Sequence, residues 1–378
     1  MHVGFTSHQT KCAIVLALTL YISICAVSFI HGSELITHKL DSKEIAGNVV
    51  GISSIRQFQV YLPDTYGEEF GERYPVLYWI PWWGQGVTGY SYRKALDDAI
   101  TSNRIPPTIA VFTDAHEKVW FLNSPALGDW EDFLILELIP FIDNNYRTIS
   151  GRFGRALMGL SSGGYTALIL PIRHPDIWAG IGMNDPALWA MWSYIHDKED
   201  FPISDVSYAQ ARAFFRQLPE NINGYNSANE YVRDIIQFGT AFSPNPDNPL
   251  LCDMPVTPQG EWDQAVRQKW SDYDLTNPQT LARHKDTLDQ LLSIVIVVPE
   301  VQDINRTNSV SNMHFLEQAE AAGVDITRLD MSGGHLDNKA ERFVAMAEQI
   351  LATVIGAETS VSSIGKSTVT WAKIKQEH

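Results

Sequence analysis

The chain has 378 residues, of which 45% are hydrophobic, and it carries a formal net charge of -16. This hydrophobic fraction is enough for a sizeable core, so disorder throughout is excluded, and the length allows one large domain or two ordinary ones. The acidic excess leaves no surplus of cations for counterion release along a nucleic acid backbone, so nucleic acid is not expected as a partner.

The N-terminal segment has the layout of a secretory signal. Lys11 precedes an uninterrupted apolar run from Cys12 to Ile30. Small residues stand at Ala26, Ser28 and Gly32. We expect residues 1–32 to be a signal peptide, which implies a secreted or periplasmic protein; the run is also long enough for an uncleaved membrane anchor.

Cysteine usage limits how the mature protein is stabilised. Cys12 and Cys25 lie inside the signal and would leave with it, so that only Cys252 remains. One cysteine forms no internal disulfide, and we interpret Cys252 as structural. No cluster of cysteine and histidine is present, so neither a structural metal nor a cofactor is expected.

Strand and helix patterns alternate along residues 33–355 and predict a doubly wound, mostly parallel sheet. The expected strands are 55–62, 74–80, 108–113, 155–159, 178–183, 291–298 and 326–331. A turn follows strand 55–62, and we expect an edge hairpin to open the domain. The expected helices are 129–145, 163–174, 312–322 and 338–355. Residues 186–278 break the pattern and are expected to form an insertion or lid, and residues 356–378 a flexible tail.

Residues 159–163, Gly-Leu-Ser-Ser-Gly, lie between a predicted strand and a predicted helix. In a nucleophile elbow the serine adopts a strained positive φ, and the residues two positions before and after it almost touch, so glycine is required there. Gly159 and Gly163 occupy these two positions. The motif therefore predicts Ser161 as a nucleophile on an α/β-hydrolase fold.

A serine nucleophile needs a histidine base and a carboxylate that orients the histidine, in the chain order serine, acid, histidine. His335 follows the last predicted strand in a glycine-rich loop and is the preferred base, whereas His284 and His314 fit surface or packing roles. Asp303 lies in the loop one strand earlier and is the preferred acid, with Glu300 as the alternative.

Two backbone N–H groups must hold the oxyanion of the tetrahedral intermediate. Ser162 follows the nucleophile and would supply the first, and Trp82 in the loop after strand 74–80 would supply the second, because Pro81 has no N–H. Aromatic residues gather in loops near the same edge, where they would either stack an aryl or sugar ring of the substrate or pack in the core under the insertion. The candidates for substrate binding are Trp83, Trp120, Trp130 and Trp189.

An ordered series of segments resembles the esterase D-like branch of the α/β-hydrolases, over residues 47–355. The segments include VYLPDTYG (60–67), NSPALGDWEDF (123–133), ELIPFIDNNYRT (137–148), RALMGLSSGGYTAL (155–168), FSPNP (242–246) and GGH (333–335). This group includes S-formylglutathione hydrolases, feruloyl and acetyl-xylan esterases and mycolyltransferases. The resemblance implies Ser161 as nucleophile, Asp303 as acid and His335 as base.

The chain departs from the family pattern at two positions. Pro81-Trp82 stands where the family usually has His-Gly, and Glu300 stands where a glycine is usual before the acid.

Taken together, these patterns predict an exported serine carboxylic-ester hydrolase that acts through an acyl-enzyme on a small-molecule or polysaccharide-linked ester. Two alternatives are an acyltransferase of the same fold and a non-catalytic relative that binds carbohydrate or a partner.

Overall fold

The computed structural model describes residues 32–67, 71–115, 119–188, 213–257, 259–300 and 306–362. The expected signal segment therefore lies outside the described residues, apart from Gly32. Among the helices that are described, none combines the length and the hydropathy needed to cross a membrane.

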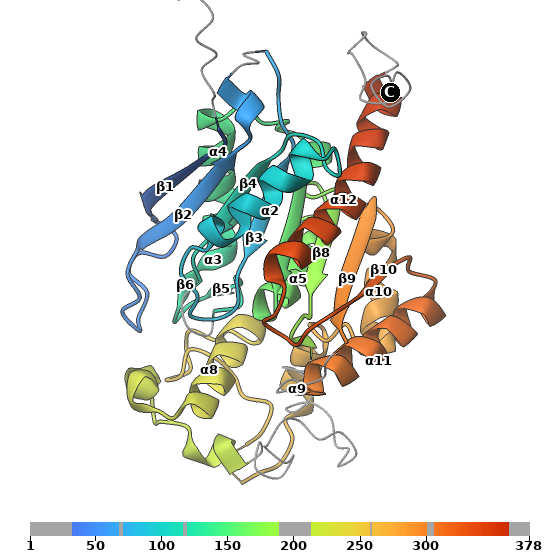
Figure 1. The fold of residues 1–378 in the computed structure, drawn as a ribbon. Coiled ribbons are helices and arrows are strands. Elements are labelled where there is room, and N and C mark those ends of the chain that lie inside the picture. The colour runs from blue at the N-terminus through green and yellow to red at the C-terminus, as the bar shows by residue number, and fades with distance from the viewer. Residues whose placement is uncertain are drawn as a thin grey trace, which may run out of the picture. The chain divides into compact units, whose positions relative to one another are not determined.

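The centre of the fold is an eight-stranded sheet with the order β1-β2-β4-β3-β7-β8-β9-β10 (Figure 1). Its strands are β1 (Glu34–Asp41), β2 (Ile55–Leu62), β3 (Val76–Ile80), β4 (Ile109–Thr113), β7 (Arg155–Leu160), β8 (Gly180–Asn184), β9 (Ser293–Pro299) and β10 (Thr327–Met331). β2 pairs antiparallel with both β1 and β4, and all the other neighbours are parallel. The carboxyl ends of β3, β7, β8, β9 and β10 therefore meet at one edge of the sheet.

The central strands are short apolar segments, as expected for a sheet covered on both faces. Every residue of β3, β4, β7 and β8 is buried. The edge strand β1 alternates between exposed and half-buried residues, which is the pattern of a strand with one solvated face.

Helices cover the two faces of the sheet. On one face, α2 (Gly89–Thr101) and α12 (Lys339–Ser362) pack over buried rings that include Trp79, Tyr92 and Phe343. The other face is covered mainly by α5 (Ser162–Arg173) and by a continuous helical stretch. That stretch consists of α3 (Trp130–Asp132), the π-helical segment η2 (Phe133–Leu138) and α4 (Ile139–Asn145).

Two further helices precede the last two strands. They are α10 (Pro278–Leu288) before β9 and α11 (Arg306–Ala322) before β10. The side chain of the N-cap residue Asn277 accepts a hydrogen bond from Gln279 N–H. Pro278 at the first helical position also fixes where α10 begins.

The described part of residues 186–278 contains no strand of the main sheet. It holds α8 (Glu230–Phe242), capped by Asn229, and α9 (Gln264–Ser271), capped by Asp263. Cys252 in this region is a free, buried thiol, and burial, with a smaller effect of Asp253, raises its pKa to about 12. Such a thiol is inert, as a structural role requires.

The structure differs from the sequence-based prediction at several elements. β2 pairs antiparallel with β1 at the edge of the sheet, so an edge hairpin does open the domain, but its other strand precedes β2, and the turn after β2 leads into a short 3-10 segment, Asp64–Gly67. The sequence reasoning did not identify β1 or α2. α11 begins at Arg306 rather than 312, and α12 continues to Ser362 rather than ending at 355.

Candidate active site

Ser161 lies in the sharp turn between β7 and α5. Its φ of 58° and ψ of -117° are strained for a residue with a side chain. A Cβ on Gly159 would come within 2.2 Å of the carbonyl oxygen of Gly163, and a Cβ on Gly163 within 2.1 Å of the carbonyl oxygen of Ile80. Both glycines are therefore required by the close approach of the backbone, as in a nucleophile elbow.

The loop after β3 lies against the elbow. The backbone N–H of Trp83 donates a hydrogen bond to Ser162 Oγ at 3.1 Å. The N–H groups of Ser162 and Trp82 have no hydrogen-bond partner among the described residues. Ser162 is in the first turn of α5, where the helix itself offers no acceptor, and Trp82 lies beyond the end of β3. These are the two donors that the sequence predicts for the oxyanion.

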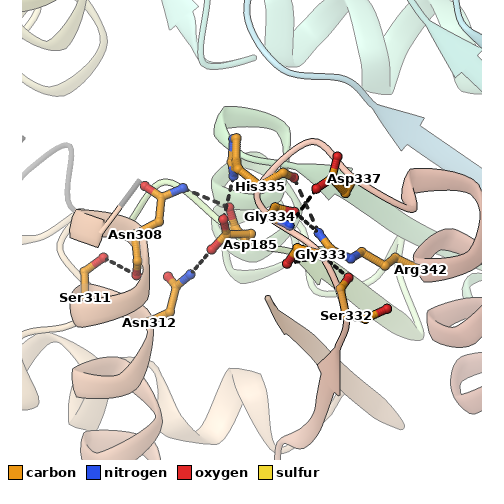
Figure 2. A network of polar contacts seen from close by, with 10 residues as sticks. All are labelled: Asp185, Asn308, Ser311, Asn312, Ser332, Gly333, Gly334, His335, Asp337 and Arg342. Atoms are coloured by element: carbon orange, nitrogen blue, oxygen red, sulfur yellow. Dashed lines mark hydrogen bonds and ion pairs between the residues drawn. The ribbon is translucent and has the colours of Figure 1, made fainter. Parts of the chain in front are cut away.

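His335 lies in the loop between β10 and α12, and its ring contacts a carboxylate (Figure 2). His335 Nδ1 lies 2.5 Å from Oδ2 of Asp185, a residue in the loop after β8. The side chain of Asp185 is 2% exposed and that of His335 is 11% exposed. An ionised carboxylate can only accept hydrogen bonds, so Nδ1 carries the proton and Nε2 is left as the basic nitrogen.

The backbone of the His335 loop is held by Arg342 of α12, whose side chain is completely buried. Its guanidinium donates hydrogen bonds to the carbonyl oxygens of Gly334 at 2.8 Å and Ser332 at 2.6 Å, and also reaches those of Gly333 and His335 (Figure 2). The fixed fork of five donors in arginine suits this task, which a single ammonium group would not fulfil.

Ser161 is connected to the Asp185 loop through its backbone. Ser161 N–H donates to the carbonyl oxygen of Asn184 at 3.0 Å, and Ala187 N–H donates to the carbonyl oxygen of Ser161 at 2.9 Å. No hydrogen bond joins the side chains of Ser161 and His335, both of which the structure describes. In enzymes without substrate, such catalytic hydrogen bonds are often long and tighten when substrate binds.

The acid expected from the sequence is not the carboxylate seen at His335. Asp303 lies outside the described residues. Glu300 is exposed, and its backbone N–H donates to the carbonyl oxygen of Met331. The sequence reasoning did not consider Asp185, although the segment Asn184-Asp185-Pro186 directly after a buried strand was an available signal.

The other two histidines considered as bases lie in α10 and α11, and neither has a hydrogen bond with Ser161 or Asp185 in the described part of the chain. His284 is in α10, where burial and then Arg283 lower its pKa. His314 is in α11, with its Nδ1 4.0 Å from the carboxylate of Glu317. The contact with Asp185 belongs to His335.

The structure separates the four tryptophans expected to bind substrate. Trp130 is completely buried, donates from Nε1 to the carbonyl oxygen of Leu127 and packs against Phe121, so the expectation that it binds substrate is wrong. Trp120 is 3% exposed and also belongs to the core. Trp83 is half-buried, with its ring 4.6 Å from that of Trp120, and Trp189 lies outside the described residues.

A group of carboxylates apart from these residues brings its oxygen atoms within 4.8 Å of one another. Within the described ranges, this group of potential metal ligands consists of Glu44, Asp129 and Asp132. Burial, with smaller effects of Asp132 and Glu131, raises the pKa of Asp129. No residue of the elbow or of the His335 loop belongs to the group.

Comparison with curated proteins finds relatives over about a third of this chain. A protein of Xylanibacter ruminicola named "Endo-1,4-beta-xylanase/feruloyl esterase" is 34% identical over 134 residues, which is 33% of this chain and 18% of that protein. An esterase of Mycobacterium tuberculosis is 36% identical over 115 residues, which is 29% of this chain and 24% of that protein. The matches thus span about a fifth of the length of these relatives.

Solved structures with a similar fold include a ferulic acid esterase, with a TM-score of 0.54 and 18% identity over 86% of this chain and 98% of that one. An S-formylglutathione hydrolase of Staphylococcus aureus has a TM-score of 0.50 and 11% identity over 84% of this chain and 99% of that one. At these identities the similarity is one of fold, and it agrees with the mostly parallel sheet and its flanking helices.

The model of one protein family, described as "Putative esterase", matches residues 51–322. The matched segment begins just before β2, contains the elbow and ends with α11. The chain therefore belongs to this esterase family and has an α/β-hydrolase fold.

Proposed function

We propose that the protein is a serine hydrolase that cleaves carboxylic esters through an acyl-enzyme on Ser161. The observation that carries this proposal is the strained φ of Ser161 at an elbow whose backbone is bonded to the loop that contacts His335. Such a strained serine is costly and persists where the surrounding structure enforces it, which is typical of a catalytic site.

In the first step His335 Nε2 takes the proton of Ser161 Oγ as the oxygen attacks the ester carbonyl. The proton passes to the departing alcohol when the tetrahedral intermediate collapses, and the acyl group stays on Ser161. Water then attacks the acyl carbon while His335 takes one of its protons, and when this second intermediate collapses the proton passes to Ser161 Oγ and the acid is released. The N–H groups of Ser162 and Trp82 would hold the oxyanion in both steps, since both lack other partners in the described part of the chain.

For the substrate we propose an ester of a carbohydrate hydroxyl group with an aromatic or short-chain carboxylic acid. Two similar proteins are named as feruloyl or ferulic acid esterases, and the half-buried Trp83 lies in the loop that faces the elbow. An aromatic ring in this position could stack an aryl group or a sugar ring. The apolar run at residues 12–30 supports export of the protein, which would bring it to extracellular esters of this kind.

The test is labelling of the mature protein with a fluorophosphonate probe beside hydrolysis of a short-chain aryl ester. Wild type should be labelled and should turn over the ester, whereas Ser161→Ala should do neither, because the attacking oxygen is missing. The matched control is Ser91→Ala, which removes an exposed hydroxyl of α2 outside the elbow and the His335 loop and should still be labelled. A wild-type protein that is neither labelled nor active would exclude the proposed function.

Product analysis distinguishes hydrolysis from acyl transfer, since both share the acyl-enzyme. A panel of acetyl, feruloyl and longer-chain esters is incubated with and without a sugar acceptor. Free acid as the main product in both cases supports the hydrolase, whereas an acylated sugar that replaces the acid would assign a transferase.

A further inference from the structure

We propose that Asp185, in the loop after β8, is the carboxylate that positions His335, and that Asn308 and Asn312 of α11 hold Asp185 in place. The proposal rests on the proposed function and assigns its acid to a different strand from the one that the family resemblance implies. In that resemblance the acid follows β9, where Asp303 lies.

Every polar group of Asp185 is engaged. Its Oδ2 contacts His335 Nδ1 at 2.5 Å, and its Oδ1 accepts a hydrogen bond from Asn312 Nδ2 at 2.9 Å. Its carbonyl oxygen accepts one from Asn308 Nδ2 at 3.2 Å (Figure 2). Its N–H donates to the carbonyl oxygen of Val297 at 3.0 Å. The carboxylate is thus fixed in position and in orientation, as the partner of a catalytic histidine must be.

The two asparagines are suited to this role by their spacing. Asn308 and Asn312 are four residues apart in α11, so their side chains lie on the same face of the helix. They are 1% and 0% exposed, and burying two amides in a helix is costly unless they have partners. Asp185 supplies an acceptor to each, which gives a reason for two asparagines at these positions.

The backbone of Asp185 is also strained. Its φ is 42°, a value that residues with side chains rarely adopt. Asn184, directly before it, and Ala187, two residues after it, are hydrogen-bonded to the N–H and carbonyl groups of Ser161. The same short loop therefore fixes the nucleophile and the carboxylate relative to each other, which links the strain at Ser161 to the strain at Asp185.

The partners of Asp185 leave its charge available to His335. Apart from His335, its partners are the amide groups of Asn308 and Asn312, which are neutral donors, and the carbonyl oxygen of Val297, which accepts from the Asp185 N–H. Arg342 in this network donates to carbonyl oxygens of the His335 loop. Asp185 can therefore stabilise the imidazolium that forms when His335 takes the proton of Ser161.

The experiment compares Asp185→Asn with Asp303→Asn and Glu300→Gln in kcat, KM and fluorophosphonate labelling rate. Asp185→Asn should lower kcat by roughly 10³- to 10⁴-fold with little change in KM, because the amide cannot favour the proton on Nδ1 or stabilise the imidazolium. Asp185→Glu, which retains the charge, should recover part of this loss. Asp303→Asn and Glu300→Gln should retain most of the activity.

The asparagines provide a second test that does not depend on whether Asp185→Asn folds. Asn312→Ala removes a hydrogen bond to the carboxylate and should lower kcat by about 10- to 100-fold with KM unchanged. Asn308→Ala removes a bond to a backbone carbonyl and should have the smaller effect. The melting temperature of each variant shows whether the protein is folded.

The outcomes separate this proposal from the proposed function. An inactive, unlabelled wild type would exclude the proposed function itself. An active wild type together with an active Asp185→Asn, or an unchanged kcat in Asn312→Ala, would overturn the role of Asp185. A loss in Asp303→Asn as large as that in Asp185→Asn would also overturn it.

Discussion

Gly163 illustrates how one missing side chain allows the elbow to form. A Cβ at this position would lie 2.1 Å from the carbonyl oxygen of Ile80 and 2.7 Å from that of Pro81, both of which are backbone atoms that cannot rotate away. The glycine thus allows the start of α5 to lie against the loop that carries Trp82, whose N–H we propose as one of the oxyanion donors.

We expect Gly163→Ala to reduce the free energy of unfolding by about 1–3 kcal/mol or more, since the new methyl group must push the backbone of β3 away. Urea unfolding would measure the change. The matched control is Gly151→Ala, because Gly151 has a φ of -85° and open space where the Cβ would stand. That change should be neutral or stabilising by up to about 1 kcal/mol, and equal losses in both variants would contradict the prediction.

At the scale of elements, α12 does more than cover the sheet. Its buried Arg342 gathers the carbonyl oxygens of residues 332–335, so the helix determines the path of the loop that presents His335. Within the loop, Asp337 accepts a hydrogen bond from Gly334 N–H and Asn338 donates one to the carbonyl oxygen of Ser332, and the guanidinium adds donors for the carbonyl oxygens.

Arg342→Met should therefore lower both activity and stability. The methionine fills the space of the stem but leaves several carbonyl oxygens without a donor, which should cost about 1–3 kcal/mol in the free energy of unfolding and about 10-fold or more in kcat. The measurements are urea unfolding and hydrolysis of an aryl ester.

A control on the same helix is Glu348→Gln, which removes the ion pair of Glu348 with Arg104. These side chains are 37% and 46% exposed, so the pair should contribute about 0–1 kcal/mol and kcat should not change. A loss of kcat in Glu348→Gln as large as that in Arg342→Met would show that the effect reflects α12 in general and not the His335 loop.

For the molecule as a whole, a buried carboxylate joins two helices of one face. Glu131 of α3 is 3% exposed and contacts two residues at the end of α5, Arg173 Nε at 2.8 Å and His174 Nε2 at 2.5 Å. Burial raises the pKa of Glu131, but the hydrogen bonds with His174 and Arg173 outweigh this effect and hold the pKa below its ordinary value of 4.5.

The pH dependence of global stability follows from this lowered pKa. In the folded protein Glu131 binds its proton less readily than in the unfolded chain, so its contribution is complete above about pH 4.5 and is lost as the pH falls through the folded value. Glu131→Gln should reduce the free energy of unfolding at pH 7 by about 1–3 kcal/mol, and the difference from wild type should shrink below pH 4.5. Urea unfolding between pH 7 and pH 3 measures it; a constant difference would contradict the prediction.

Patterns that are local in the chain predicted much of the fold. The apolar runs at 55–62 and 155–160 indicated β2 and β7, because a buried strand requires apolar residues at successive or alternate positions whatever its neighbours are. The sequence did not predict β1, because a strand at the exposed edge of the sheet requires no apolar pattern. α2 begins at Gly89 with no side-chain cap, so it had no clear start signal.

The sequence by itself determined the elbow, the serine within it and the histidine after the last strand, because spacing along the chain specifies the strained turn and the order of the loops. Only the tertiary structure decided which carboxylate contacts that histidine. Asp185 and His335 are 150 residues apart. A carboxylate in any loop at the carboxyl edge satisfies the chemistry, so its choice depends on how β8, α11 and the loop after β10 pack together.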